Sequence, residues 1–183
     1  MKPKKKELPK KRAIFIDRDG TINVDHGYTY RIEDFHFLPK AIEGLKMLAK
    51  LDYKLIIITN QSGIGRGLYT HKQFEEVTQH MLKELTQHHL HIDKVYHCPH
   101  HPDEKCTCRK PEIGMLKQAE KDFNLDLRHC FMIGDLDKDI EAGKRAGCKT
   151  ILIKNKEYAV TTTPDVTVTT IVEAAEWIKK QRG

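Results

Sequence analysis

The sequence has no long apolar run, and this absence excludes a membrane-spanning protein. No stretch approaches the roughly 20 apolar residues that a helix needs to cross a bilayer. No apolar stretch follows the charged residues 1–12 either, so we expect no secretory signal and no membrane partner. Internal repeats and low-complexity blocks are also absent from residues 13–183. These features predict one folded domain in the cytoplasm.

Cysteine is scarce as well. The 183 residues include five cysteines, an odd number, and three of them lie between positions 98 and 108. A disulfide-stabilised secreted domain is therefore disfavoured, and a cytoplasmic protein with a metal site is the better interpretation.

Excess charge is missing from most of the chain. The net charge is +6, but residues 1–12 hold seven of the 32 Lys and Arg and only one of the 26 Asp and Glu. Residues 13–183 are therefore neutral overall. Because a polynucleotide-binding domain usually has a basic face on its folded part, we expect no nucleic-acid partner. We interpret residues 1–12 as a basic flexible tail and residues 13–183 as the domain.

Short apolar runs alternate with longer segments of helical periodicity. The runs at 13–16, 55–58, 131–133 and 150–153 show no alternation of polar and apolar residues, which is typical of strands buried on both faces. Apolar residues three and four apart predict helices at 42–49, 74–85, 115–119, 140–146 and 171–178. This order predicts an α/β fold with a Rossmann-like, mainly parallel sheet covered by helices on both faces.

Polar residues end three of the predicted strands: Asp17, Thr59 and Asp135. Ligands of such sheets bind beyond the carboxyl ends of the strands, so these residues are candidates for one site. Asp19 returns to the side of Asp17, and Gly20 permits the tight turn that this needs. Two close carboxylates can act as nucleophile and general acid, and together they attract Mg²⁺ beside a phosphate.

Two further residues strengthen this interpretation. Lys110, just before Pro111, can supply a fixed positive charge, and Asp139 lies four residues after Asp135 as a supporting acid. The alternative is that residues 17–21, DRDGT, are only a surface turn, since Asp and Gly are common in turns. The additional strand-end features disfavour that alternative.

A cluster of cysteine and histidine predicts a zinc site. Its candidate ligands have the spacings Cys-x-His and Cys-x-Cys: Cys98, His100, Cys106 and Cys108. Three thiolates and one imidazole suit tetrahedral Zn²⁺ in a closed, structural site. His97 and His101 flank the cluster, and either could replace His100. Arg109 and Lys110 follow the last cysteine directly, so the metal would fix both cations.

Four segments in this order resemble the motifs of haloacid-dehalogenase (HAD) superfamily phosphatases: DRDGT at 17–21, ITNQSG at 58–63, Lys110, and GDLDKD at 134–139. The resemblance covers nearly the whole chain after residue 12 and implies a HAD-like fold. Members of this superfamily often carry an inserted cap domain. Only 20 residues separate Asp19 from Lys40, too few for a folded insertion, so we expect no large cap domain.

The resemblance also implies a role for each residue. Asp17 would attack phosphorus and form an aspartyl-phosphate, while Asp19 would protonate the leaving oxygen and later activate water. Catalytic Mg²⁺ would be held by Asp17, the carbonyl of Asp19 and Asp135. Thr59 and Lys110 would bind the phosphoryl oxygens. In the resembling family, the matching cysteine and histidine positions are ligands of structural Zn²⁺.

A finer resemblance rests on NVDHGY at 23–28 and on the Cys/His loop before residues 109–111. Both are similar to D-glycero-D-manno-heptose 1,7-bisphosphate 7-phosphatases, with histidinol-phosphate phosphatases as close relatives. The implied function is Mg²⁺-dependent removal of the 7-phosphate in the synthesis of nucleotide-activated heptose for lipopolysaccharide. The alternatives are a histidinol-phosphate phosphatase, a polynucleotide 3′-phosphatase, or a non-catalytic zinc-stabilised binding module.

Loop residues around the predicted site are candidates for substrate binding. Asp25, His26, Gly27 and Tyr28 could contact sugar hydroxyls. Guanidinium groups match phosphate geometry, so a second phosphate could meet the two nearby arginines. The complete predicted set adds these residues: Thr59, Asn60, Gln61, Ser62, Arg66, Arg109 and Lys110. We expect a monomer that acts on a small sugar phosphate.

Overall fold

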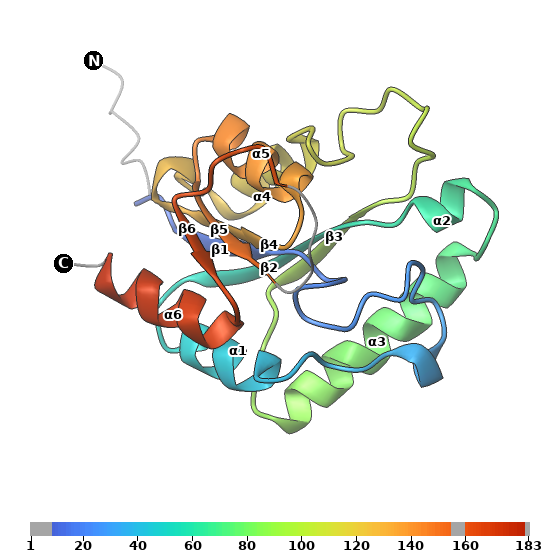
Figure 1. Ribbon diagram of the computed structural model, residues 1–183, viewed down its shortest axis with the longest axis horizontal. Coiled ribbons are helices and arrows are strands. Elements are labelled where there is room, and N and C mark those ends of the chain that lie inside the picture. Colours follow the sequence, from blue (N-terminus) through green and yellow to red (C-terminus); the bar gives the residue numbers. More distant parts are fainter. Residues whose placement is uncertain (1–8, 155–159, 182–183) are drawn as a thin grey trace, which may run out of the picture.

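Six parallel strands form a single sheet in the computed structural model, which describes residues 9–154 and 160–181 (Figure 1). Their order across the sheet is β3-β2-β1-β4-β5-β6. The strands are β1 (Ala13–Ile16), β2 (Lys54–Asn60), β3 (Lys94–Cys98), β4 (Phe131–Gly134), β5 (Lys149–Ile153) and β6 (Val166–Val168). The predicted parallel α/β fold is confirmed.

Helices cover both faces of the sheet, as predicted (Figure 1). One face packs against α1 (Ala41–Ala49), α3 (His71–Gln87) and α6 (Ile171–Lys180). The other face packs against α4 (Gly114–Phe123) and α5 (Asp137–Ala146). Three short helical segments complete the described elements: α2 (Ser62–Gly65), η1 (Ile32–Asp34) and η2 (Leu127–His129).

Strand β1 shows why the apolar runs contain no polar positions. Ile14 and Ile16 belong to the core beneath α1, α3 and α6, whereas Ala13 and Phe15 belong to the core beneath α4 and α5. All four side chains are completely buried. A central parallel strand has no solvent-facing side, so each of its positions is apolar.

The outer strands β3 and β6 were not predicted from the sequence. Both lie at an edge of the sheet, where side chains are partly exposed. Lys94 is exposed and only Cys98 is buried in β3, while β6 is three residues long. Neither segment therefore forms the continuous apolar run that identifies a strand buried on both faces.

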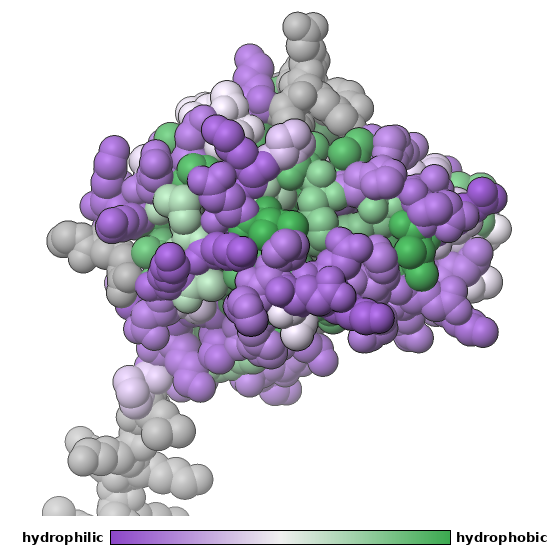
Figure 2. Space-filling model, turned by 90° about the horizontal axis from the view of Figure 1, so that it is seen from below, coloured by the Kyte–Doolittle hydropathy of each residue, from purple (hydrophilic) through white to green (hydrophobic). Residues whose placement is uncertain are grey.

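Contacts with the folded domain begin before residue 13 in the described part of the chain. The Lys11 N–H donates to the carbonyl of Asn124 at 2.9 Å, and the Asp126 N–H donates to the carbonyl of Lys11 at 3.0 Å. Residues 1–8 of the predicted tail lie outside the described residues, so the tail stays a prediction. No helix in the described ranges is both long and apolar enough to span a bilayer. The face in Figure 2 is mostly hydrophilic.

The topology brings the motif residues to one edge of the sheet. Strand order reverses between β1 and β4, and ligands of such folds bind beyond the strand ends at this point. Asp17 follows β1 and Asp135 follows β4, while Thr59 lies near the end of the adjacent β2. The segment between β1 and α1 contains only loop and the short η1, which confirms that no cap domain is inserted there.

Candidate active site

A buried lysine organises the centre of the site. The Lys110 Nζ lies 2.8 Å from Asp17 Oδ1 and 2.7 Å from Asp139 Oδ1, and it donates to the carbonyl of Ile58 at 2.7 Å. Burial alone would lower the pKa of Lys110, but the negative charges of Asp139 and Asp17 raise it above its ordinary value. The ammonium group therefore stays charged and cannot move away from the nucleophile candidate.

The surrounding carboxylates fit a divalent cation. Oxygens of Asp17, Asp135 and Asp139 lie within 4.8 Å of one another, and Asp135 Oδ2 is buried without a hydrogen-bond partner. Asp139 is already engaged, because Lys110 contacts Oδ1 and the Leu136 N–H donates to Oδ2 at 3.0 Å. Asp17 and Asp135 are therefore the side chains that would hold Mg²⁺, a cation that prefers carboxylate oxygens.

The pKa values of Asp17 and Asp135 are raised, which shows that their ionised forms are unfavourable without a nearby cation. Burial raises the pKa of Asp135 to about 8, and the neighbouring charges of Asp17 and Asp139 add to this effect. Burial and the charge of Asp139 raise the pKa of Asp17 to about 6, although Lys110 and Lys138 oppose the shift. A bound cation would remove much of this cost by neutralising the carboxylates.

Position 20 must be glycine because the segment after β1 passes very close to Asp135, which follows β4. The φ of Gly20 is +81°, and a Cβ at this position would lie 2.2 Å from Asp135 Oδ2. Any side chain here would be strained and would displace the Asp135 carboxylate.

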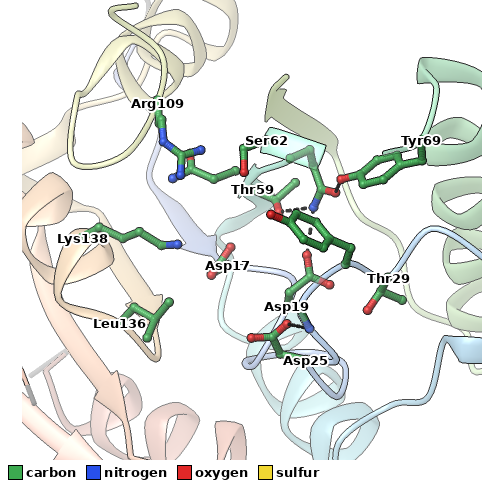
Figure 3. A pocket seen from close by; sticks show the side chains of 14 residues that line it. Asp17, Asp19, Asp25, Thr29, Thr59, Ser62, Tyr69, Arg109, Leu136 and Lys138 are labelled. Carbon is green, nitrogen blue, oxygen red and sulfur yellow. Dashed lines mark hydrogen bonds between the residues drawn. The ribbon is translucent and has the colours of Figure 1, made fainter. Parts of the chain in front are cut away.

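The second carboxylate lies beside different partners. Arg18, Asn23 and Gln61 all donate hydrogen bonds to Asp19, which lines the same cavity as Asp17 (Figure 3). The structure thus places one carboxylate beside the cation-binding acids and the other in a separate hydrogen-bond network. This division suits one nucleophile and one proton-transferring group.

The cavity contains most of the predicted substrate-binding residues and four that were not predicted. The predicted residues that line it are Asp17, Asp19, Asp25, Gly27, Tyr28, Thr59, Asn60, Gln61, Ser62 and Arg109. The additional lining residues are Thr29, Tyr69, Leu136 and Lys138. Arg109, from the loop before α4, and Lys138, from α5, both point into the cavity, and Lys138 extends toward Asp17 (Figure 3).

Three predicted substrate-binding residues do not line this cavity: His26, Arg66 and Lys110, the last of which is buried against Asp17. His26 and Arg66 are exposed outside the cavity, so their contacts with substrate stay predictions. Lys138 was not predicted, because it lies within the acidic segment 135–139, whose pattern points to its carboxylates. Its position one residue before Asp139, in the first turn of α5, was the available signal.

The predicted zinc ligands converge on one point. Sγ atoms of Cys98 and Cys108 are 3.1 Å apart, Cys106 Sγ is 3.6 Å from both, and His100 Nδ1 lies 3.2 Å from Cys108 Sγ. This donor set and its compactness fit tetrahedral Zn²⁺. Four donors close the coordination shell, as in a structural site.

The geometry distinguishes among the three candidate histidines. The ring of His97 packs against Phe74 at a centroid distance of 4.3 Å, away from the sulfur atoms. His101 Nδ1 accepts a hydrogen bond from the Asp103 N–H. His100 is therefore the histidine that the cluster includes.

The loop that carries Cys106, Cys108 and Lys110 is joined directly to β2. The Asn60 Nδ2 donates to the carbonyl of Lys110, and the Lys110 N–H donates to Asn60 Oδ1, both at 3.0 Å. Because Lys110 follows Cys108 by two residues, the metal cluster and β2 together set the position of its ammonium group.

Comparisons with known proteins agree with this geometry. Residues 107–174 match the HAD-hydrolase-like family model. The crystal structure of D,D-heptose 1,7-bisphosphate phosphatase from B. bronchiseptica, complexed with magnesium and phosphate, is similar with a TM-score of 0.82 and 27% identity. The match covers 93% of this chain and 99% of that chain. The fold and the site define a phosphatase of the HAD superfamily.

Two curated relatives are closer in sequence. The D-glycero-β-D-manno-heptose-1,7-bisphosphate 7-phosphatase of Pasteurella multocida is 46% identical over 151 residues, covering 79% of this chain and 82% of the relative. The corresponding enzyme of Campylobacter jejuni, named for the α anomer, is 45% identical over 148 residues, covering 81% and 85%. The chain belongs to the D-glycero-D-manno-heptose-1,7-bisphosphate 7-phosphatase family.

Mg²⁺ should stabilise the protein more at high pH than at low pH. Asp17 and Asp135 have pKa values of about 6 and 8, above the ordinary 3.8, so the metal-free fold binds more protons than the unfolded chain. Its stability therefore falls as the pH rises from about 4 to about 8. The increase in melting temperature on adding Mg²⁺ should be larger at about pH 8.5 than at about pH 5.5. Equal increases would contradict this assignment.

Loss of a zinc ligand should weaken the fold and the site together. We expect one equivalent of zinc to remain after mild EDTA treatment that removes Mg²⁺ and reversibly stops catalysis. Cys108→Ser should lower the melting temperature by about 5–15 °C, a few kcal/mol for a chain of this size. Cys148→Ser, a buried cysteine outside the cluster, should keep its zinc. Zinc-free protein with full activity and unchanged melting would refute the structural role.

Proposed function

We propose that this protein removes the 7-phosphate from D-glycero-D-manno-heptose 1,7-bisphosphate through a phosphoenzyme formed on Asp17. The observation that carries the reaction type is the Asp17 carboxylate, held 2.8 Å from the buried Lys110 ammonium in a cavity that Asp19 also lines. Membership of the heptose-bisphosphatase family supports the choice of substrate.

In the first step, a carboxylate oxygen of Asp17 attacks phosphorus in line with the bond to the sugar oxygen. The new bond from this oxygen to phosphorus forms as the bond from phosphorus to the sugar oxygen breaks. Asp19 gives a proton to the departing oxygen, so the sugar leaves as a neutral alcohol. The acid must start this step protonated and ends it ionised.

Positive charge and donors must hold the phosphoryl oxygens during this transfer. When bound by Asp17 and Asp135, Mg²⁺ supplies charge that offsets the negative charge on these oxygens. Lys110 is held in place by Asp139 and the Ile58 carbonyl, so its charge is positioned before substrate arrives. Phosphoryl transfer depends mainly on such positioning and electrostatics.

In the second step, the ionised Asp19 takes a proton from water as the water oxygen attacks phosphorus. The bond between Asp17 and phosphorus breaks, inorganic phosphate leaves, and both carboxylates return to their starting states. The use of one group as acid and then as base follows from the order of the two steps.

The second phosphate of the substrate would meet the cationic side of the cavity. Arg109 and Lys138 both line it, whereas Arg66 is exposed outside it. We therefore assign distal phosphate recognition to Arg109 with support from Lys138. The guanidinium group provides paired donors, and the ammonium group provides a point charge.

We also propose that the protein works in the cytoplasm as a monomer. Zinc requires the thiols of Cys98, Cys106 and Cys108 in reduced form, and the cytoplasm keeps them so.

Asp17→Asn should lower turnover by about 10⁴-fold or more, because an amide oxygen is not an effective nucleophile. The variant should also lose covalent labelling by BeF₃⁻. Asp19→Asn should keep Mg²⁺ binding and lose about 10²- to 10⁴-fold in turnover, the usual contribution of general acid–base catalysis. Substantial activity in Asp17→Asn would overturn the assignment of the nucleophile.

Arg109→Ala should erase much of the preference for a bisphosphate. One charge-assisted contact to phosphate contributes about 1.5–3 kcal/mol, or about ten- to a hundredfold in kcat/KM. The measurement compares heptose 1,7-bisphosphate, the 7-monophosphate and histidinol phosphate in parent and variant. Turnover of histidinol phosphate above that of the bisphosphate would overturn the substrate while keeping the mechanism. The absence of turnover with every phosphomonoester in Mg²⁺ would favour a binding module.

A further inference from the structure

Gln61 lies between Asp19 and Thr59 in the lining of the catalytic cavity. It follows β2 directly and is only 2% exposed. Its backbone N–H donates to the carbonyl of Cys98 at 2.8 Å, which fixes the residue to the neighbouring strand β3. Its side chain lines the cavity together with Asp19, Thr59 and Tyr69.

Every hydrogen of the Gln61 amide is used within the protein. The Nε2 group donates to Asp19 Oδ2 and to Thr59 Oγ1, both at 2.8 Å. A side-chain amide has two N–H groups, so none remains to donate to a substrate. This arrangement differs from the predicted substrate contact and gives Gln61 two protein partners that both have roles in the reaction.

Those two partners line the same cavity, in which the phosphoryl group would bind. Asp19 transfers the proton in the proposed mechanism. Thr59 accepts a hydrogen bond from Gln61, so its own hydroxyl hydrogen can be directed toward a phosphoryl oxygen in the cavity. One amide thus contacts both the acid/base group, Asp19, and the hydroxyl of Thr59, which would donate a hydrogen bond to the phosphoryl group.

Tyr69 determines which way the amide points. Its hydroxyl donates to Gln61 Oε1 at 2.6 Å, and burial raises the pKa of Tyr69 above its ordinary value, so the hydroxyl keeps its proton. If the amide were reversed, Oε1 would face the Asp19 carboxylate and Nε2 would face the tyrosine. The Tyr69 ring is itself stacked on Tyr30, with centroids 5.2 Å apart and an interplanar angle of 3°.

Arg18 contacts both Asp19 and Gln61, because its Nη2 also donates to Gln61 Oε1 at 3.4 Å. The guanidinium is completely buried, and its Nη2 lies 2.9 Å from both oxygens of Asp19. It also donates to the carbonyl of Thr29 at 3.0 Å, and it lies 5.6 Å from the centre of the Phe74 ring. A buried cation that loses its carboxylate partner is strongly destabilised, so Arg18 keeps the carboxylate close between turnovers.

We propose that Gln61 is a positioning residue that orients the carboxylate of Asp19 and the hydroxyl of Thr59, with Tyr69 fixing its amide and Arg18 fixing Asp19. The proposal rests on the proposed aspartyl-phosphate mechanism. Without the amide, Asp19 Oδ2 loses the Gln61 bond, and the carboxylate is held by Arg18 and Asn23, so it is no longer fixed toward the water that must be deprotonated. Hydrolysis of the phosphoenzyme should then become slow, because it requires a correctly placed base.

A substrate with a good leaving group distinguishes slow hydrolysis of the phosphoenzyme from a general loss of active-site structure. p-Nitrophenolate leaves without a proton, so formation of the phosphoenzyme from p-nitrophenyl phosphate does not need Asp19 as an acid. Gln61→Met should therefore release p-nitrophenol in a burst of about one equivalent per active site, followed by turnover about 10- to 100-fold slower than in the parent. Covalent phosphate in acid-quenched samples should rise in parallel.

The sugar phosphate should behave differently with the same variant. Its alcohol leaving group needs the proton of Asp19, so both steps slow and no burst should appear. We expect kcat to fall more than KM rises. Gln118→Met is a matched control, because Gln118 is exposed on α4 and its amide donates only to Asp122 among the described contacts. It should show parent rates with both substrates.

Tyr69→Phe provides a second, milder test, because it keeps the ring and removes only the hydroxyl. It should show the same burst with turnover about two- to tenfold slower, as expected for one hydrogen bond. Unchanged steady-state rates in both variants, or a burst that shrinks together with the rate, would overturn the proposal. A parent enzyme that turns over sugar phosphate without forming any covalent phosphate would instead overturn the proposed mechanism.

Discussion

The ion cluster around Lys110 is the interaction on which the rest of the site depends. An ammonium group buried without a partner would cost several kcal/mol, so the fold must bring carboxylates to it. Asp17 arrives from the end of β1 and Asp139 from the first turn of α5, while β2 contributes the Ile58 carbonyl. Asp135 adds a third acid, whose pKa is raised to about 8 because one nearby lysine does not offset burial and the charges of Asp17 and Asp139. A divalent cation bound by Asp17 and Asp135 would offset the electrostatic cost of these clustered acids.

The zinc cluster explains how so short a chain can hold that lysine without an inserted domain. The loop between β3 and α4 has no helix or strand of its own, and a loop of this kind ordinarily loses much conformational entropy when fixed. Four donors to one metal would hold it at a single point. The Asn60 side-chain amide then holds the Lys110 backbone through two hydrogen bonds, so the metal, the loop and β2 would form one continuous support.

Two buried cations pair with the two different carboxylates of the site. Lys110 lies beside Asp17, the proposed nucleophile, and Arg18 lies beside Asp19, the proposed acid/base group. The two acids are separated by one residue in the sequence yet have unlike surroundings. Asp17 lies among other carboxylates, whereas Asp19 is surrounded by hydrogen-bond donors. This difference allows two chemically identical side chains to perform different tasks.

The sequence by itself determined the central strands, the strand-end acids and the composition of the zinc cluster. Central parallel strands are buried on both faces, and metal ligands must be Cys, His or acid, so both leave a local pattern. Tertiary structure alone decided the rest. Edge strand β3 has half-exposed side chains and no such pattern, and the choice of His100 over His97 depends on how the ring packs on Phe74. Gln61 looked like a substrate contact because a sequence gives residue types but not partners. Its hydrogens are used by side chains that only folding brings to it.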